Sequence, residues 1–223
     1  MAINHDPRCR QCRREGVKLY LKGDKCYTPK CTLDKTGKDN KTRWRDKPPG
    51  WGSGAGQGNM YQKKLTEYGV QLREKQKLRR MYRVLESQFS NYYQEAVRRP
   101  GVTGENLLQL LELRFDNVVF RLGLASSRAH ARQLVSHRHF TINGKRVNIA
   151  SYIMKPGDVI AVHETMVSNE CIKEARDRVV KRSTPEWMEL NRHTLEGRVL
   201  SLPTRDQIDT TIREQLIVEF YSR

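Results

Sequence analysis

Apolar residues recur every three or four positions through two long stretches of the chain, which is the spacing of one face of an α-helix. In residues 65–96 these positions are Leu78, Tyr82, Leu85, Phe89, Tyr92 and Ala96. In the second stretch, which begins near Thr103 and ends at Gly123, they are Leu107, Leu111, Phe115, Val118 and Leu122. Each stretch predicts one amphipathic helix with its apolar side towards a core.

A third helix and a β-hairpin are predicted between residues 126 and 162. The segment SSRAHARQLVSHR opens with serines, which suit a helix N-cap, and places Arg128 and Arg132 on one face because they are four residues apart. It is followed by alternating apolar positions on both sides of Asn143-Gly144, a dipeptide that favours a two-residue hairpin turn. A small β unit should therefore close this part of the chain.

The remaining elements are shorter. Residues 171–182 have helical spacing, and residues 186–190 and 197–202 read as short strands. The run LIVEFYS at residues 216–222 is rich in β-branched and aromatic residues and predicts a terminal strand. These elements together define an α+β fold, mostly helical in its N-terminal part.

Residues 34–60 have no apolar period and are rich in glycine, proline and lysine, which is typical of an extended loop. The loop includes Arg43 and Arg45. We expect these side chains to follow a phosphate backbone when a nucleic acid is bound.

Positive charge is unevenly distributed, and it points to a polyanionic partner. The chain has 223 residues, with 42 Lys and Arg against 25 Asp and Glu. Residues 1–100 hold 24 basic and 10 acidic side chains, a net charge of +14, whereas residues 101–223 hold 18 and 15, a net charge of +3. Clustering of this degree favours nucleic acid as the partner.

The sequence contains no membrane-spanning run and no apolar N-terminal segment of the signal-peptide type. We therefore expect a cytoplasmic protein with no membrane partner.

Four of the five cysteines lie close together, at Cys9, Cys12, Cys26 and Cys31. Two close pairs separated by a hairpin-sized segment suit one tetrahedral structural Zn²⁺ site, because each pair binds the ion from one turn. A cytosolic chain disfavours disulfides, and no βαβ context for a redox pair is visible. An iron–sulfur cluster and unligated thiols remain the alternatives to zinc.

Enzymatic chemistry has little support in the sequence. There is no phosphate-binding loop with its lysine and following helix, and no nucleophile, base and carboxylate stand in a recognisable arrangement. We expect a binding protein and not an enzyme.

Three stretches of sequence resemble one known family. They are EYGVQLREKQKLRRMYRVLESQFSNYYQEA, then VTGENLLQLLELRFDNVVFRLGLASSRAHARQLVSHRHFTINGKRVNIASYIMKPGDVI, and the terminal REQLIVEFYSR. Together they resemble the bacterial small-subunit ribosomal protein S4 family, in its zinc-binding four-cysteine subtype. Residues 112–162 are similar to that family's RNA-binding module, which also occurs in some pseudouridine synthases and tyrosyl-tRNA synthetases.

The resemblance implies a structural component of the small ribosomal subunit and a primary binder of small-subunit (16S-type) rRNA. It implies that the chain nucleates assembly of the subunit body, contacts neighbouring ribosomal proteins and contributes to translational accuracy. It also implies a basic patch along the path by which mRNA enters the subunit, where Lys63 and Lys64 lie. Zinc occurs in only part of this family.

We divide the chain into a zinc knuckle at 1–33, a basic loop and helical domain at 34–102 that is completed by about 171–223, and an S4-type RNA-binding module at 103–170. We expect phosphate neutralisation by basic side chains on the first long helix and on the module. These are Lys75, Lys77, Arg79, Arg80, Arg83, Arg128, Arg132, Lys145 and Arg146. The alternatives are an RNA-modifying enzyme with the same module and a zinc-containing DNA-binding regulator.

Overall fold

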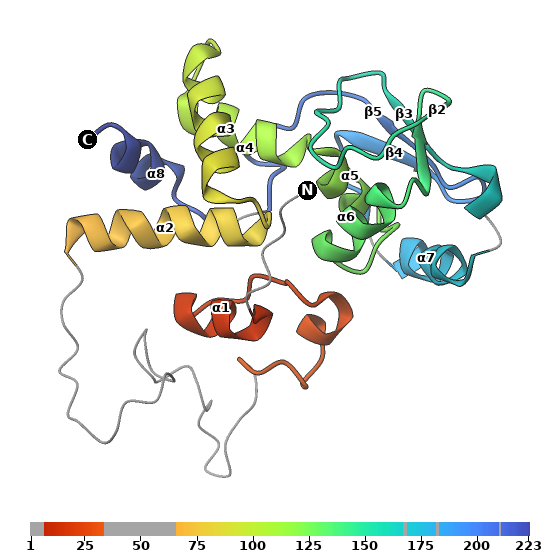
Figure 1. Ribbon diagram of the computed structural model, residues 1–223, viewed down its shortest axis with the longest axis horizontal. Coiled ribbons are helices and arrows are strands. Elements are labelled where there is room, and N and C mark those ends of the chain that lie inside the picture. The colour runs from red at the N-terminus through yellow and green to blue at the C-terminus, as the bar shows by residue number, and fades with distance from the viewer. Residues whose placement is uncertain (1–6, 34–65, 167–168, 182, 210) are drawn as a thin grey trace. The chain divides into compact units, whose positions relative to one another are not determined.

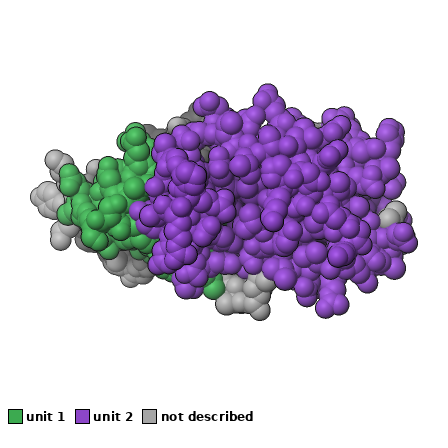
Figure 2. Space-filling model, turned by 90° about the horizontal axis from the view of Figure 1, so that it is seen from above, with its two compact units in different colours: residues 1–86, 212–223 green, residues 87–211 purple. Residues whose placement is uncertain are grey.

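The computed structural model describes residues 7–33, 66–166, 169–181, 183–209 and 211–223. The chain forms two compact units, which Figure 2 shows in different colours. Unit 1 comprises Met1–Glu86 and Ile212–Arg223, and unit 2 comprises Ser87–Thr211. The predicted loop at 34–60 lies outside the described residues.

Unit 1 is helical. Its elements are α1 (Arg8–Glu15), the short 3-10 helix η1 (Gly23–Tyr27), α2 (Glu67–Met81) and α8 (Glu214–Tyr221). Helix α2 begins at an N-cap, since Thr66 Oγ1 accepts a hydrogen bond from the Gly69 backbone N–H at 3.2 Å. Helix α8 packs along α2 although more than 130 residues separate them in the sequence (Figure 1).

The terminal strand predicted at 216–222 is wrong, because this segment forms α8. A helix satisfies its own backbone hydrogen bonds, and it places Ile217, which is fully buried, on one side together with its neighbours one turn away. Contacts with α2 stabilise the helix: Gln71 Nε2 donates to Glu219 Oε2 at 2.9 Å, and the Tyr68 and Phe220 ring centroids lie 5.5 Å apart.

Unit 2 combines helices with one antiparallel sheet. Its helices are α3 (Glu86–Arg98, whose first residue closes unit 1), α4 (Thr103–Glu112), α5 (Phe115–Arg121), α6 (Arg128–Ser136), η2 (Glu164–Met166) and α7 (Glu170–Lys181). Its strands are β1 (Phe140–Ile142), β2 (Lys145–Arg146), β3 (Val159–Val162), β4 (Met188–Asn191) and β5 (Glu196–Val199). The strand order is β2-β1-β3-β5-β4.

Several sequence predictions for unit 2 are confirmed. The Asn143-Gly144 hairpin forms between β1 and β2, and both turn residues have positive φ, at 50° and 79°. Ser127 caps α6 by accepting from the His130 backbone N–H at 3.3 Å. Helix α7 and strands β4 and β5 occur where the pattern placed them, with ends shifted by a few residues.

The first long helix is interrupted between α2 and α3. Arg83 has a left-handed backbone with φ 55°, and its N–H donates to the Arg80 carbonyl while the Val84 N–H donates to the Arg79 carbonyl, each at 3.1 Å. These two bonds form the Schellman motif that ends many helices, usually with glycine at the left-handed position. Val84 is buried at the turn, which anchors it.

The second long helix is also interrupted, between α4 and α5. The Phe115 N–H donates to the Tyr152 carbonyl and the Met154 N–H donates to the Leu113 carbonyl, both at 2.8 Å. A segment 40 residues downstream therefore takes backbone hydrogen bonds that a continuous helix would have used.

The predicted domain boundaries differ from the units. The chain end at 212–223 joins the N-terminal helices, as the prediction has it. Residues 171–211 belong instead to unit 2, because β5 pairs with β3 through Val159 opposite Arg198 and Ile160 opposite Gly197. The sheet of the module is thus extended by two strands that the sequence pattern assigned to the other domain.

A large apolar cluster in unit 2 includes residues from Leu113 to Val199 along the sequence. It includes Phe115 and Phe140, whose rings meet edge to face at 6.4 Å, and the fully buried Trp187. This cluster fixes α5 and α6 against the sheet.

Candidate nucleic-acid interface and cysteine site

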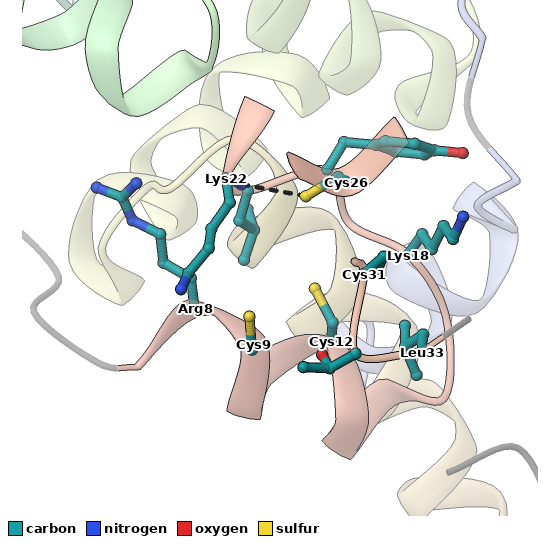
Figure 3. A pocket seen from close by; sticks show the side chains of 11 residues that line it. Arg8, Cys9, Cys12, Lys18, Lys22, Cys26, Cys31 and Leu33 are labelled. Atoms are coloured by element: carbon teal, nitrogen blue, oxygen red, sulfur yellow. Dashed lines mark hydrogen bonds between the residues drawn. The ribbon is translucent and has the colours of Figure 1, made fainter. Parts of the chain in front are cut away.

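The four cysteines of the N-terminal segment line one small cavity in unit 1. Cys9 and Cys12 extend from α1 towards the segment that carries Cys26 (Figure 3). Helix α1 ends at Gly16, whose φ of 69° lets the chain turn back after the first cysteine pair. The Lys22 backbone N–H donates to Cys26 Sγ at 3.4 Å, which orients the first cysteine of the second pair.

Burial shifts the pKa of two of the four thiols, Cys12 and Cys26. It raises the pKa of Cys12 to about 11, although a hydrogen bond from the Leu19 backbone works in the other direction. Burial also raises the pKa of Cys26, with the Lys22 backbone opposing it. Both residues are therefore thiols at neutral pH unless a bound cation stabilises the thiolates.

As placed, the His, Cys, Asp and Glu side chains of the described ranges form no group of three or more that could hold a metal ion. The four cysteines are free of disulfides. The sequence prediction that they share one location agrees with the cavity, and ligation by a metal stays a prediction.

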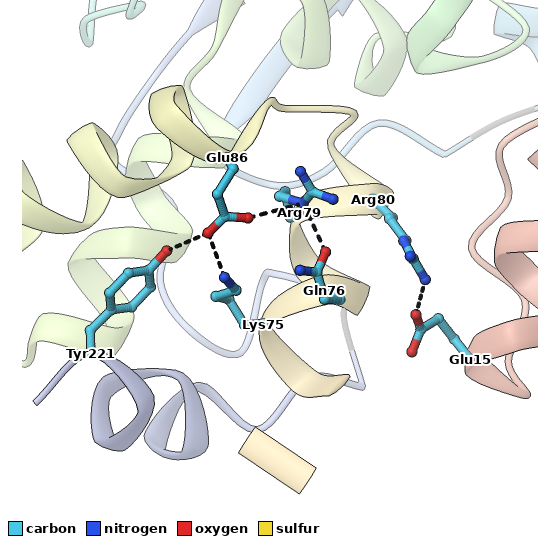
Figure 4. A network of polar contacts seen from close by, with 7 residues as sticks. All are labelled: Glu15, Lys75, Gln76, Arg79, Arg80, Glu86 and Tyr221. Atoms are coloured by element: carbon cyan, nitrogen blue, oxygen red, sulfur yellow. Dashed lines mark hydrogen bonds and ion pairs between the residues drawn. The ribbon is translucent and has the colours of Figure 1, made fainter. Parts of the chain in front are cut away.

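The basic side chains of α2 are held by carboxylates. Lys75 is buried and pairs with Glu86, and Arg79 Nε lies 3.4 Å from the second Glu86 oxygen (Figure 4). Lys77 Nζ lies 2.5 Å from Glu74 Oε1. Phosphate neutralisation requires an exposed cation, but the structure buries Lys75, whose ammonium lies 4.6 Å from the Phe220 ring centroid.

Arg80 connects α2 to α1. It pairs with Glu15, whose carboxylate is completely buried, and Arg73 Nη1 lies 3.5 Å from the same oxygen (Figure 4 shows Arg80 and Glu15). Burial raises the pKa of Glu15, and Arg80 and Arg73 oppose this effect. Burial also lowers the pKa of Arg80, against the influence of Glu15. Arg80 thus has a structural partner in addition to any RNA contact.

The predicted basic edge of α6 is only partly exposed. Arg128 Nε donates to Asn117 Oδ1 at 2.7 Å, and its guanidinium lies 4.8 Å from the Phe120 ring centroid. Arg132 is buried, contrary to the expected exposed position. Burial lowers the pKa of Arg132, and the Asp116 carboxylate opposes that effect.

Lys145 and Arg146 are exposed basic residues at the edge of the sheet. They form β2, one of its two edge strands. The hairpin positions them by a side-chain bridge at its turn: Asn143 Nδ2 donates to Asp158 Oδ1 at 2.8 Å, and Asn143 Oδ1 accepts from the Val159 N–H at 2.9 Å. Arg43, Arg45, Lys63 and Lys64 lie outside the described residues.

Sequence reasoning missed the role of Arg114. Its side chain is completely buried and donates to both Asp116 oxygens, at 3.0 and 2.8 Å, and to the Tyr92 hydroxyl at 2.6 Å. Burial alone lowers the pKa of Arg114, but Asp116 and Tyr92 more than offset this, so the pKa is raised. No spacing rule signals this network, because a tertiary break in the helix creates it.

Two family models cover most of the chain. Residues 4–112 match the model described as ribosomal protein S4/S9 N-terminal domain, and residues 113–160 match the S4 domain. The second match spans α5, α6, the hairpin and the start of β3. The fold and the matched models define the class: a protein with an S4 domain that follows an N-terminal domain of the ribosomal protein S4/S9 type.

The relatives narrow the class to one family. The chain is 56% identical over 215 residues to small ribosomal subunit protein uS4 of Pelotomaculum thermopropionicum, covering 96% of each chain. It is 55% identical to uS4 of Desulforamulus reducens over 223 residues, 100% of each chain, and 57% identical to uS4 of a Thermoanaerobacter species over 217 residues, 97% of each. The chain belongs to the uS4 family of small ribosomal subunit proteins.

No helix within the described segments is long and apolar enough to cross a membrane.

Proposed function

We propose that this protein is a structural, non-catalytic component of the small ribosomal subunit that binds small-subunit rRNA. The observation that carries the proposal is identity of 55% to a uS4 protein across the full length of both chains. The net charge of +17 supports a polyanionic partner.

The exposed cations of the hairpin support a specific mode of binding. Lys145 and Arg146 lie on an edge strand whose position is fixed by the Asn143 bridge, so they meet phosphates with little reorganisation. Arg79 and Arg80 contribute less per residue, because carboxylates already neutralise part of their charge. We infer that the hairpin supplies phosphate contacts and that α2 adds affinity through the remaining positive field.

Finer roles follow from the family. We propose that the protein is a primary binder of small-subunit rRNA in early assembly of the subunit body. We also propose that it contacts neighbouring ribosomal proteins and affects the accuracy of translation. We further propose that Lys63 and Lys64 face mRNA where it enters the subunit. These roles place the protein in the cytoplasm, within the small subunit.

A salt titration tests the RNA-binding proposal. We expect the full chain to bind the 5′ region of small-subunit rRNA far more tightly than duplex DNA at equal salt, with log affinity falling linearly with log salt. The double variant Lys145→Ala and Arg146→Ala should lower the slope by about one unit for each phosphate that the variant no longer neutralises. Equal affinity for the two nucleic acids contradicts the proposal.

A matched control keeps the charge change constant. Lys173→Ala with Arg192→Ala also removes two exposed cations from unit 2, away from β2. We expect a clearly smaller change in slope than for the hairpin variant. Equal slopes in the two double variants would assign the effect to net charge and not to the hairpin.

We also propose that Cys9, Cys12, Cys26 and Cys31 bind one structural Zn²⁺. Their common cavity supports this, as does the Lys22 N–H aimed at Cys26 Sγ, because such a donor stabilises a ligating thiolate. Four thiolates would leave no open position on the ion, so the metal would organise the segment. Because the thiols must lose protons to bind, zinc affinity should fall as pH falls.

Metal analysis of cysteine variants tests the site. We expect one zinc per chain in the unmodified protein and none in Cys9→Ser with Cys12→Ser, with faster amide exchange in residues 7–33 and unchanged exchange in unit 2. Cys171→Ser, which removes the fifth cysteine, should keep the zinc. Iron in place of zinc would indicate a cluster, and no metal in the unmodified chain would refute the site.

A further inference from the structure

Two tyrosine rings are stacked on the surface of the cysteine segment. The ring centroids of Tyr20 and Tyr27 lie 4.9 Å apart, with 27° between the ring planes. Tyr20 is 38% exposed and Tyr27 is 61% exposed. Both stacked rings therefore keep surface in contact with solvent, and Tyr27 keeps more of it than Tyr20.

The backbone beneath the rings is firmly anchored. Leu19 and Leu21 are buried on either side of Tyr20, and the buried Cys26 directly precedes Tyr27. Tyr20 itself has a left-handed backbone with φ 51°, a conformation that non-glycine residues adopt rarely. The rings are therefore presented by a rigid base, and this lowers the entropic cost of binding a ligand on them.

The chain segment that carries the tyrosine pair is rich in lysine. Four lysines and one acidic residue, Asp24, lie between positions 18 and 30. The lysines are Lys18, Lys22, Lys25 and Lys30. Lys18 and Lys22 line the cysteine cavity (Figure 3), and Tyr20 also belongs to its lining. Exposed aromatic rings among lysines are typical of surfaces that bind unpaired nucleotides, where bases stack and cations attract phosphates.

We propose that the Tyr20–Tyr27 pair is a stacking platform for an unpaired nucleobase of RNA, with the neighbouring lysines holding the adjacent phosphates. The inference rests on the proposed RNA-binding function and adds a place and a mode of contact to it. RNA is favoured over a protein partner because the positive charge of this segment matches a phosphate backbone. Stacking on a π face does not select one base, so the platform recognises single-stranded character.

Two short RNAs of equal length separate stacking from charge. The full chain is titrated with a single-stranded oligoadenylate 12-mer and with a 12-base-pair RNA duplex, by fluorescence anisotropy at several salt concentrations. We expect Tyr27→Ala to weaken single-strand binding about tenfold with an unchanged salt slope, and to change duplex binding less than twofold. Lys25→Ala should instead lower the single-strand slope by about 0.7.

Two controls protect this test from folding artefacts. Tyr27→Phe keeps the ring and should bind the single strand within twofold of the unmodified chain. Val97→Ala removes another exposed apolar side chain, 54% exposed, that lies on α3 outside the cysteine segment, and should leave single-strand affinity unchanged. Equal amide exchange of residues 7–33 in Tyr27→Ala and the unmodified protein would show that the segment is intact.

The outcomes separate the stacking platform from the proposed rRNA-binding function on which it rests. Unchanged single-strand binding of Tyr27→Ala, or equal losses on both RNAs, would overturn the platform and leave the rings as a protein contact. Preference of the unmodified chain for rRNA over DNA can hold in that case, and the proposed function with it. Loss of that preference would instead refute the function.

Discussion

Each of the two units buries a carboxylate against arginine, but the surroundings differ. In unit 2, Asp116 pairs with Arg114 two residues away, and both side chains are buried. In unit 1, Glu15 pairs with Arg80, 65 residues further along the chain, and joins two helices. Both members of the first pair are enclosed, whereas the second pair links two helices that are distant in the sequence.

The environment decides what each pair does. The Asp116–Arg114 pair has both carboxylate oxygens satisfied and a third hydrogen bond to Tyr92, so it holds the α4–α5 break in one geometry. Glu15 has a second buried oxygen, Oε2, without a hydrogen-bond partner among the described residues. A fully paired buried network specifies a structure, whereas an incompletely paired one retains a desolvation cost.

The largest effect should come from breaking the enclosed pair. Arg114→Leu leaves Asp116 charged and buried, which should reduce the free energy of unfolding of unit 2 by about 3–5 kcal/mol. Urea denaturation followed by tryptophan fluorescence measures this, with Trp44 and Trp51 replaced by Phe in every variant so that Trp187 alone reports on unit 2. Arg114→Leu with Asp116→Leu removes both charges and should lose less than the single variant; an equal or greater loss would show that packing, and not charge, is responsible.

A smaller effect is expected at the junction in unit 1. Glu15→Gln keeps the shape but removes the charge facing Arg80 and Arg73, which should cost about 1–2 kcal/mol. Amide exchange should accelerate in α1 and α2 and not in unit 2. Glu67→Gln, at a carboxylate that is 92% exposed, is the control and should show no measurable change. Faster amide exchange in both units would contradict the idea that the Glu15–Arg80 pair stabilises unit 1 alone.

The smallest effect is expected for a pair within one helix turn. Lys77→Ala removes the ion pair with Glu74 three residues earlier, and such pairs contribute about 0.2–0.5 kcal/mol. Thermal unfolding in low and in high salt measures this effect. Salt screens the ion pair, so the stability difference between Lys77→Ala and the unmodified protein should be smaller in high salt. A loss as large as that of Glu15→Gln would mean that Lys77 has a further structural role.

Local pattern predicted the elements whose hydrogen bonds are local. Helix α6 begins at a serine cap, and the β1–β2 hairpin turns at Asn143-Gly144, because these residues satisfy or permit the backbone conformation themselves. The same pattern failed where distant chain segments compete. The α4–α5 break depends on residues 150–154, and α8 depends on contacts with α2.

The candidate sites divide in the same way. The spacing of the cysteines and the excess of basic residues are visible in the sequence, and so is the family resemblance. Which cations remain exposed is not visible, since periodicity places Lys75 and Arg132 on a helix surface without showing what covers that surface. The structure buries both and leaves Lys145 and Arg146 exposed.

The sequence alone determined the α+β class, the excess of positive charge, the spacing of four cysteines in two close pairs and the family. Composition, spacing and similarity are properties of the chain itself. The tertiary structure decided where the long helices break, which strands complete the sheet and which arginines become structural. These outcomes depend on backbone hydrogen bonds and burial between segments far apart in sequence. Stacking of Tyr20 on Tyr27 is likewise a consequence of the fold.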